Sequence, residues 1–87
     1  MFEPNRPYRV SPHVAVRPEE FGALLYDYGT RRLSFLKTPT LVTVVTTLAE
    51  HADVHTTLDT AGVPDTQRAA YLSALAGLAE AGTIEPR

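Results

Sequence analysis

The side chains most able to bind a metal in this 87-residue chain are His51 and His55, which stand four residues apart with Asp53 between them. Two imidazoles and a carboxylate can ligate a divalent metal when one helix presents them together. Here the spacing crosses a predicted helix break, and no third ligand position is evident. We therefore expect a solvated connection at these histidines and no metal site.

The other reactive side chains lack the partners that catalysis needs. The chain has no cysteine, which excludes a disulfide framework, a thiolate metal site and a thiol nucleophile. Ser34 and Ser73 have no base placed beside them, and solvation explains the acidic pair Glu19-Glu20. The five glycines are scattered and form no phosphate loop. So short a chain also leaves little material for a deep pocket. The sequence therefore predicts a binding module with no catalytic residues and no cofactor.

Three of the eight basic residues, Arg31, Arg32 and Lys37, flank one short alternating segment. Charges at the ends of a strand can protect an exposed sheet edge from unwanted pairing. The same charges would attract acidic residues of an extended peptide that adds a strand along residues 32–37, where main-chain hydrogen bonds supply affinity. Both interpretations stay open on these residues alone.

The elements that must position this segment begin with three short strands. Alternating hydrophobicity predicts strands over residues 13–17, 22–28 and 32–37, the first of them closed by Pro18. A turn at Gly29 joins the second and third strands, because glycine supplies the positive φ of a tight hairpin. The order is that of an antiparallel meander whose last strand has an open outer edge.

The period changes to that of helices after the third strand. Thr38 can cap a helix and Pro39 suits its first position. The apolar residues over 41–49 then follow a helical stripe, although the β-branched run 42–47 favours a strand by propensity. The periodicity and the Thr38-Pro39 start together predict a helix over this segment.

Two more helices follow. The second is expected from Asp53 to Gly62, and the third from Pro64 to Gly82, with residues 83–85 as an extended tail. The fold class is α+β, a winged-helix-like arrangement of a three-stranded antiparallel sheet followed by three helices. Residues 1–7, with two prolines, are expected to form a flexible arm ahead of one domain over residues 8–85.

Nucleic acid and membranes are poor partners for this composition. The formal charge is −2 and the pI about 5.8, and the third helix offers only Gln67 and Arg68 to a DNA groove. The longest apolar run, residues 41–49, is too short to span a bilayer, and the first ten residues do not resemble a signal peptide. We expect a cytoplasmic protein that contacts neither nucleic acid nor membrane.

Longer stretches of the sequence resemble a known family. The segment over residues 21–37, FGALLYDYGTRRLSFLK, followed by a Pro-led helix, closely resembles the small chaperones of mycofactocin biosynthesis. The opening YRVSPHVAVRPE and the closing AYLSALAGLAEAGTI are similar to that family as well, so the resemblance covers residues 8–84. More distantly, the layout is similar to PqqD-like domains, which recognise the leader peptides of ribosomally made, modified peptides. One departure is Glu50-His51-Ala52-Asp53, where many PqqD-like domains carry Asp-Gly.

The resemblance implies a non-catalytic peptide chaperone in the maturation of a ribosomal peptide. Its partners would be the mycofactocin precursor peptide and a radical S-adenosylmethionine maturase, which carries the iron–sulfur clusters. In PqqD-like domains the guest peptide pairs with the third strand and packs against the third helix. Carried over, the peptide-binding residues are Arg31, Arg32, Leu33, Ser34, Phe35, Leu36, Lys37, Tyr71, Leu72 and Leu75.

Two alternatives remain, a winged-helix DNA-binding regulator and an interaction domain that pairs with itself through its strand edge. Proline at Ser34 is expected to weaken peptide binding if the Ser34 N–H faces outward. Alternation alone leaves open which face of this strand turns to the core.

Overall fold

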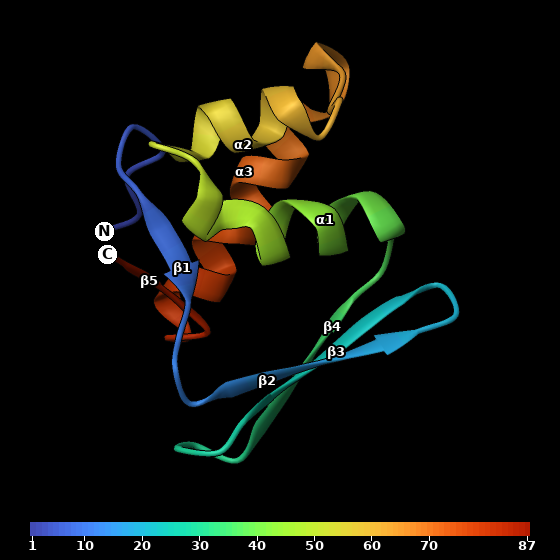
Figure 1. Cartoon of the computed structure of the whole chain (residues 1–87), viewed down its shortest axis with the longest axis vertical. Helices are drawn as coiled ribbons and strands as arrows, with labels where there is room; N and C mark the ends of the chain where they lie inside the picture. Colours follow the sequence, from blue (N-terminus) through green and yellow to red (C-terminus); the bar gives the residue numbers. More distant parts are fainter.

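All 87 residues are described by a computed structural model, in which three helices lie on one side of a small antiparallel sheet (Figure 1). The elements, in chain order, are β1 (Tyr8–Val10), β2 (Val14–Glu19), β3 (Gly22–Asp27), β4 (Arg32–Leu36), α1 (Pro39–Thr47), a 3₁₀ turn η1 (Leu48–Glu50), α2 (Val54–Thr60), α3 (Asp65–Glu80) and β5 (Ile84–Pro86). The predicted α+β class, with three antiparallel strands followed by three helices, is confirmed. No helix is both long enough and apolar enough to cross a membrane.

The main sheet has the order β2-β3-β4 and is built from two consecutive hairpins. Along β3, Ala23 and Leu25 are fully buried and Asp27 nearly so. These residues face the helices, whereas the residues between them face the opposite side. Pro18 was expected to end the first strand, but it lies inside β2. That strand is at an edge of the sheet, where a missing N–H costs no ladder hydrogen bond.

The turn between β3 and β4 differs from the prediction in one residue. Gly29 was expected to take the positive φ, but Arg31 takes it, at 60°. Gly29 serves a different need, because a Cβ there would stand 3.2 Å from the Asp27 side chain and 3.3 Å from the His13 ring. The turn is longer than a two-residue loop, and the left-handed residue falls at its end.

The three helices begin at the predicted residues, and side chains cap the first two. The Thr38 hydroxyl caps α1 by accepting a hydrogen bond from Leu41 N–H at 3.1 Å. The Asp53 carboxylate caps α2 by accepting a hydrogen bond from Thr56 N–H at 2.7 Å. In α1 three threonine hydroxyls donate to carbonyl oxygens four residues earlier, so the β-branched run 42–47 keeps its polar groups satisfied within a helix. Periodicity outweighed propensity here because Val44 and Val45 are fully buried.

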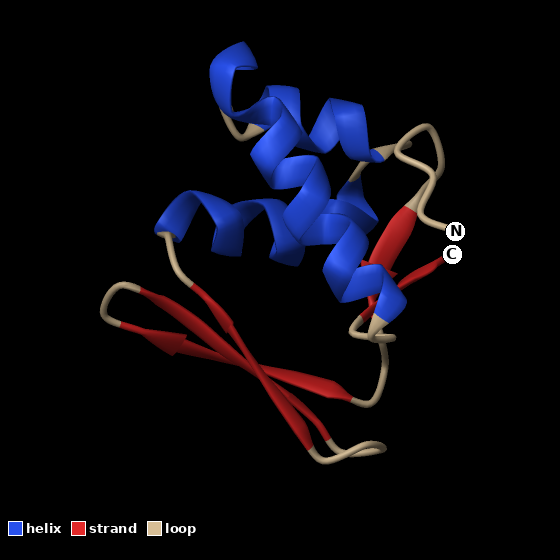
Figure 2. Ribbon diagram, turned by 180° about the vertical axis from the view of Figure 1, so that it is seen from behind, coloured by secondary structure: helices blue, strands red, loops and turns tan.

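A second, two-stranded sheet joins the two ends of the chain. β1 and β5 pair antiparallel, with Arg9 opposite Glu85 and a 2.7 Å ion pair between their side chains. The hydrogen bond from Arg9 is the largest influence on the Glu85 carboxyl and holds its pKa below the ordinary value. Figure 2 shows this ribbon beside the helices, apart from the main sheet, with the N- and C-termini close together. The extended tail was predicted, but its pairing with β1 was not.

The first seven residues contact the folded part of the chain. The Phe2 ring lies 5.0 Å from the buried ring of Tyr8, whose hydroxyl accepts from Glu3 N–H at 2.9 Å. Pro4 accepts a hydrogen bond from Val54 N–H at 3.0 Å. The flexibility of this arm stays a prediction. A flexible arm would have to break these contacts.

Candidate functional site

The backbone of β4 leaves two residues with unpaired groups on its outer edge. On the other side of β3, Tyr28 N–H donates to the His13 carbonyl at 2.8 Å, so the even-numbered residues of β3 bond to β2. Backbone groups of successive strand residues point to opposite sides, so the odd-numbered residues of β3 bond to β4. Their partners on β4 are Arg32, Ser34 and Leu36. The N–H and C=O groups of Leu33 and Phe35 therefore face away from the sheet.

The opposite edge of the sheet, formed by β2, has fewer free backbone N–H groups than the β4 edge. Its outward-facing positions are Val14, Val16 and Pro18. Pro18 has no N–H, and Val14 N–H already donates to the Ser11 carbonyl at 3.0 Å. Only Val16 N–H is left, whereas β4 offers two successive outward N–H groups. An added strand would find its regular hydrogen-bond partners on β4 and not on β2.

The side chains of β4 separate into two sets. Leu36 is buried in the core, and Ser34 is partly buried on the same side. Leu33 and Phe35 point to the face without helices and are 65% and 49% exposed. This settles which face turns inward. Because the register pairs Ser34 with Leu25, Ser34 N–H bonds to β3. A proline at Ser34 would therefore break the sheet and would not test an outward donor.

A small apolar groove continues from the end of β4 between α1 and α3. It has a volume of about 140 Å³ and is lined by Thr38, Leu41, Ala70, Tyr71 and Ala74. Such a volume is well below the roughly 300 Å³ at which small-molecule pockets begin, and suits one or two side chains of an extended peptide. Thr38 stands two residues after the last residue of β4, so the groove lies where the inward-facing side chains of an added strand would reach.

The predicted helix residues do not all line this groove. Tyr71 does, but Leu75 is fully buried in the core, and Leu72 packs against the core as a partly buried residue. The wide apolar stripe of α3 consists of two faces, one that lines the groove and one that packs in the core. Tyr71 shares its face with Ala70 and Ala74, whose small side chains leave the space of the groove. Alanine beside a tyrosine at helical spacing was the signal in the sequence, and it was too weak to select this face.

The predicted basic residues Arg31, Arg32 and Lys37 are all exposed, and none makes an ion pair or a side-chain hydrogen bond. The other basic side chains are engaged, for example Arg87, which donates to the His51 carbonyl. Free cations at both ends of an open strand are available to an acidic guest.

The turn that presents Arg31 is held by the Asp27 carboxylate. Its Oδ1 accepts from Gly29 N–H at 2.8 Å and from Thr30 N–H at 3.1 Å. Burial raises the pKa of the Asp27 carboxyl, but these hydrogen bonds and the neighbouring His13, whose Nε2 lies 3.4 Å from Oδ2, outweigh it and hold the pKa below its ordinary value. Asp27 therefore stays ionised at neutral pH and fixes where β4 begins.

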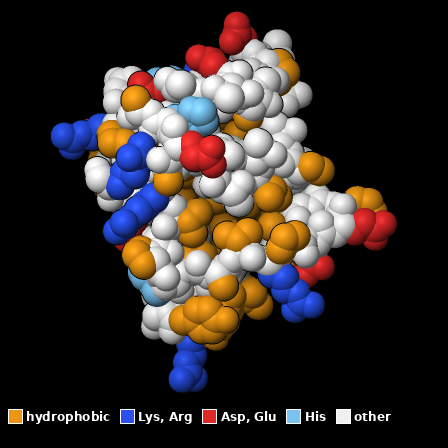
Figure 3. Space-filling model, viewed as in Figure 1, with side chains coloured by type: hydrophobic (Ala, Val, Ile, Leu, Met, Phe, Trp, Pro, Cys, Tyr) orange, Lys and Arg blue, Asp and Glu red, His pale blue; other side chains and the backbone are white.

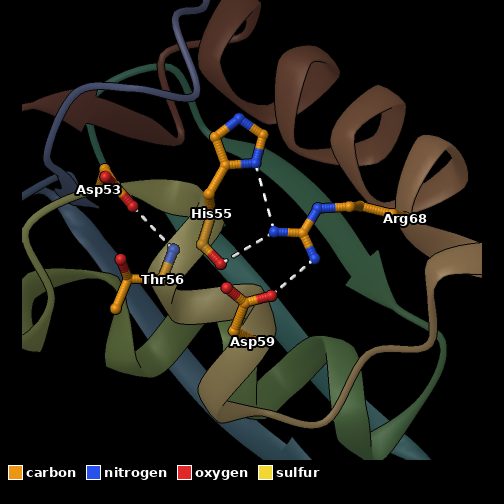
Figure 4. A network of polar contacts seen from close by, with 5 residues as sticks. All are labelled: Asp53, His55, Thr56, Asp59 and Arg68. Atoms are coloured by element: carbon orange, nitrogen blue, oxygen red, sulfur yellow. Dashed lines mark hydrogen bonds and ion pairs between the residues drawn. The ribbon is translucent and has the colours of Figure 1, made fainter.

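The polar residues around α2 form a structural network (Figure 4). Arg68 of α3 donates to the Asp59 carboxylate at 2.9 Å and to the His55 carbonyl at 3.1 Å, and so ties α3 to α2. Its side chain is only 22% exposed. Arg68, the one cation of α3, is therefore engaged with α2, which argues against a DNA-reading helix.

No three histidine, cysteine or acidic side chains lie close enough together to hold a metal ion. A second cavity, of about 530 Å³, is lined mainly by apolar residues of the arm, β1, α3 and β5, and Glu80 is its one acidic side chain. An α+β module with one open strand edge, an adjoining apolar groove and no gathered catalytic side chains has the form of a peptide-binding domain.

Comparison with known proteins agrees with this class. The family model described as "Peptide chaperone MftB family" matches residues 7–85. The chain is 51% identical over 86 residues to proteins named peptide chaperone MftB from Mycobacterium ulcerans and Mycobacterium tuberculosis, covering 99% of this chain and 79% of each relative. It is 52% identical over 85 residues to the one from Mycolicibacterium smegmatis, covering 98% and 83%. No solved structure matches the chain. The chain belongs to the peptide chaperone MftB family.

Proposed function

We propose that this protein is a cytoplasmic, non-catalytic chaperone that binds the mycofactocin precursor peptide as an added strand along β4 and presents it to a radical S-adenosylmethionine maturase. The observation that carries the proposal is the pair of outward N–H and C=O groups at Leu33 and Phe35, on the one edge of the sheet that is open. Main-chain pairing gives affinity to any extended peptide, so the surroundings of β4 must supply selectivity.

The selectivity we propose has two parts. An added strand places every second side chain on the helical side of the sheet, where the groove beside Tyr71 has room for a small apolar anchor. Its remaining length runs past Arg31, Arg32 and Lys37, which favour carboxylates in the guest. The preferred guest is therefore an extended segment with an aliphatic anchor between acidic residues.

The two alternatives are less well supported. A DNA-binding regulator needs cations on its recognition helix, and α3 has only the engaged Arg68. Self-pairing of two β4 edges in an antiparallel dimer would bring the cations at the start of one strand close to Lys37 of the other copy. Like charges facing each other across a strand pair are destabilising.

Titration calorimetry with the synthetic precursor peptide tests the proposal. We expect saturable binding of one peptide per chain at micromolar concentrations or below. No heat with tens of micromolar protein, together with unchanged amide resonances of β4, would exclude the precursor as the guest. A salt-titrated DNA shift assay addresses the DNA-binding alternative, because phosphate contacts give a steep loss of affinity with salt.

The basic residues predict a kinetic effect. The double change Arg31→Glu and Lys37→Glu should slow association with the precursor by about tenfold at low salt and affect dissociation much less, because exposed charges act mainly on the encounter. Stopped-flow fluorescence over a series of salt concentrations measures this.

The matched control for this experiment is Arg6→Glu with Arg87→Glu, which changes the net charge equally at the termini. If both pairs slow association to the same extent, net charge and not the β4 cations would be responsible. If neither pair changes the rate or its salt dependence, electrostatic steering of the guest is wrong.

A further inference from the structure

The face of the main sheet turned away from the helices is an exposed apolar surface, which we call the outer face. Its side chains are those on the outward side of the three strands and at their ends: Ala15, Arg17, Glu19, Leu24, Tyr26, Tyr28, Leu33, Phe35 and Lys37. Leu24 stands directly opposite Phe35, and Tyr26 opposite Leu33. The Tyr26 and Tyr28 rings meet edge to face with centroids 4.7 Å apart. The apolar side chains are therefore contiguous across β3 and β4.

No helix or strand of the chain covers this face. In Figures 1 and 2 the helices lie on one side of the sheet in both views, and the other side is empty. Of the five large apolar side chains that the chain exposes, three belong to the outer face, with Tyr28 and Leu33 about two-thirds exposed. Exposed apolar side chains that adjoin one another in this way are typical of a protein-binding site, whereas single exposed ones are ordinary.

The outer face is distinct from the proposed peptide site even where the two share a strand. A guest on β4 bonds to the backbone groups of Leu33 and Phe35 in the plane of the sheet, whereas the side chains of these residues stand perpendicular to it. Leu24 and Arg17 lie further from the β4 edge, on β3 and β2. One partner can therefore occupy the edge while another covers the outer face.

Charge distinguishes the kinds of protein that could cover this face. Residues 14–38, which build the sheet, carry four basic and three acidic residues, and one of the acids, Asp27, is buried. Residues 39–80, which build the helices, carry five acidic residues and one arginine. Figure 3 shows hydrophobic side chains over the middle and lower part of the molecule, with acidic ones at its top and right edge and basic ones at its upper left, lower right and bottom. The sheet is therefore the side that an acidic partner approaches.

A second copy of the chain fits less well. In a symmetric dimer the outer face would pack against the outer face of the other copy, so the interface would hold Arg17 and Lys37 twice. The one acidic side chain beside Arg17 is Glu19, 3.5 Å away on the same strand, and it is already paired. A partner with an apolar centre and carboxylates at its rim satisfies both the cations and the apolar surface.

We propose that the outer face docks the enzyme that modifies the bound peptide, through an apolar patch with an acidic rim on that enzyme. This rests on the proposed function for the existence of that enzyme. The arrangement places the enzyme against the side chains of β4 while the guest lies on the backbone of the same strand. The peptide is then held at the border of the enzyme contact.

The test uses two changes on the outer face that leave the β4 backbone intact, Leu24→Ser and Arg17→Glu. Affinity for the purified maturase and for the precursor peptide is measured separately by calorimetry, and folding is checked by thermal melting. We expect Leu24→Ser to weaken maturase binding about tenfold, as for a central apolar contact, with peptide affinity within about twofold of the wild type. Arg17→Glu, whose side chain is 80% exposed, should weaken maturase binding in a salt-dependent way without affecting folding.

Unchanged maturase affinity in both variants would overturn the assignment, as would an equal loss of peptide and maturase affinity. A wild-type dimer in sedimentation that Leu24→Ser dissociates would show that a second copy covers the face, and would also overturn it. If the wild type binds no precursor peptide, the proposed function fails. The proposed docking surface is then tested by maturase binding alone. Weaker maturase binding by the Leu24→Ser variant would still support that surface.

Discussion

Replacing Leu33 by proline is expected to weaken binding of the precursor peptide about thirtyfold while the chain remains folded. Leu33 N–H faces away from β3, so the change removes no hydrogen bond of the sheet. It removes the donor that we propose a guest strand uses, and it leaves the guest carbonyl without a partner. A lost hydrogen bond and a stranded acceptor together cost about 2 kcal/mol, which corresponds to this factor in affinity. Calorimetry with the precursor peptide measures it.

Three controls separate the missing donor from other effects of the change. Leu33→Ala removes the same exposed side chain but keeps the N–H, and should bind within about threefold of the wild type. Val16→Pro removes the outward N–H of the opposite edge, where Pro18 already stands, and should leave peptide affinity unchanged. Ser34→Pro removes a donor to β3 and should unfold the hairpin.

The outcome that would contradict strand addition along β4 is a folded Leu33→Pro chain that binds the peptide like the wild type. Loss of affinity in Leu33→Ala equal to that in Leu33→Pro would assign the effect to the side chain and place the guest on the outer face. Loss in Val16→Pro would move the guest to β2. Each result points to a different surface of the same small sheet.

The sequence was sufficient for the order of elements because its local signals agree with the fold. Alternating residues gave the three strands of the main sheet, and Thr38 and Asp53 marked the helix starts through caps that the structure contains. Even the β-branched run of α1 was resolved correctly, because burial of Val44 and Val45 on one face outweighs their strand propensity.

The pairing of the chain ends could not be predicted, because it depends on contacts between residues more than seventy positions apart. β1 and β5 are three residues each, too short for a periodic signal. β1 also carries Tyr8, which is buried although tyrosine is often partly exposed. The Arg9–Glu85 ion pair then selects the register, but only once both strands are already neighbours.

The sequence was sufficient to locate the segment that forms the candidate site. It was not sufficient to predict which backbone groups and side chains of that segment face outward. The segment 31–37 was found from its charges and its alternation. The direction of each backbone group depends on which residues of β3 bond to β2, and one hydrogen bond, from Tyr28 to His13, decides it. For the same reason Leu75 was listed among the peptide-binding residues, although it lies in the core. Spacing along α3 gives faces, but not which neighbour covers each face.

The position of β4 itself depends on Gly22, and Gly22→Ala is expected to destabilise the fold by about 3 kcal/mol. A Cβ at Gly22 would lie 1.8 Å from the Leu36 carbonyl oxygen and 2.9 Å from its carbon. Both are backbone atoms at the end of β4, so no side-chain rotation can relieve the clash. The strand must shift, and with it Thr38 and the start of α1. For a domain of this size the melting temperature should fall by on the order of 15 °C, as measured by circular dichroism.

Gly77→Ala is the matched control, because it makes the same chemical change in α3, where an added Cβ meets nothing within 4 Å. It should raise stability by about 0.5–1 kcal/mol, since alanine loses less backbone freedom than glycine in a helix. The two substitutions therefore have opposite expected signs. A Gly22→Ala chain that melts at or above the wild-type temperature would show that β4 is free to move away from β3 at Leu36. The fixed edge on which we place the guest peptide would then not exist. A destabilised chain that loses peptide affinity even well below its melting temperature would instead show that the exact position of the end of β4 is part of the binding site.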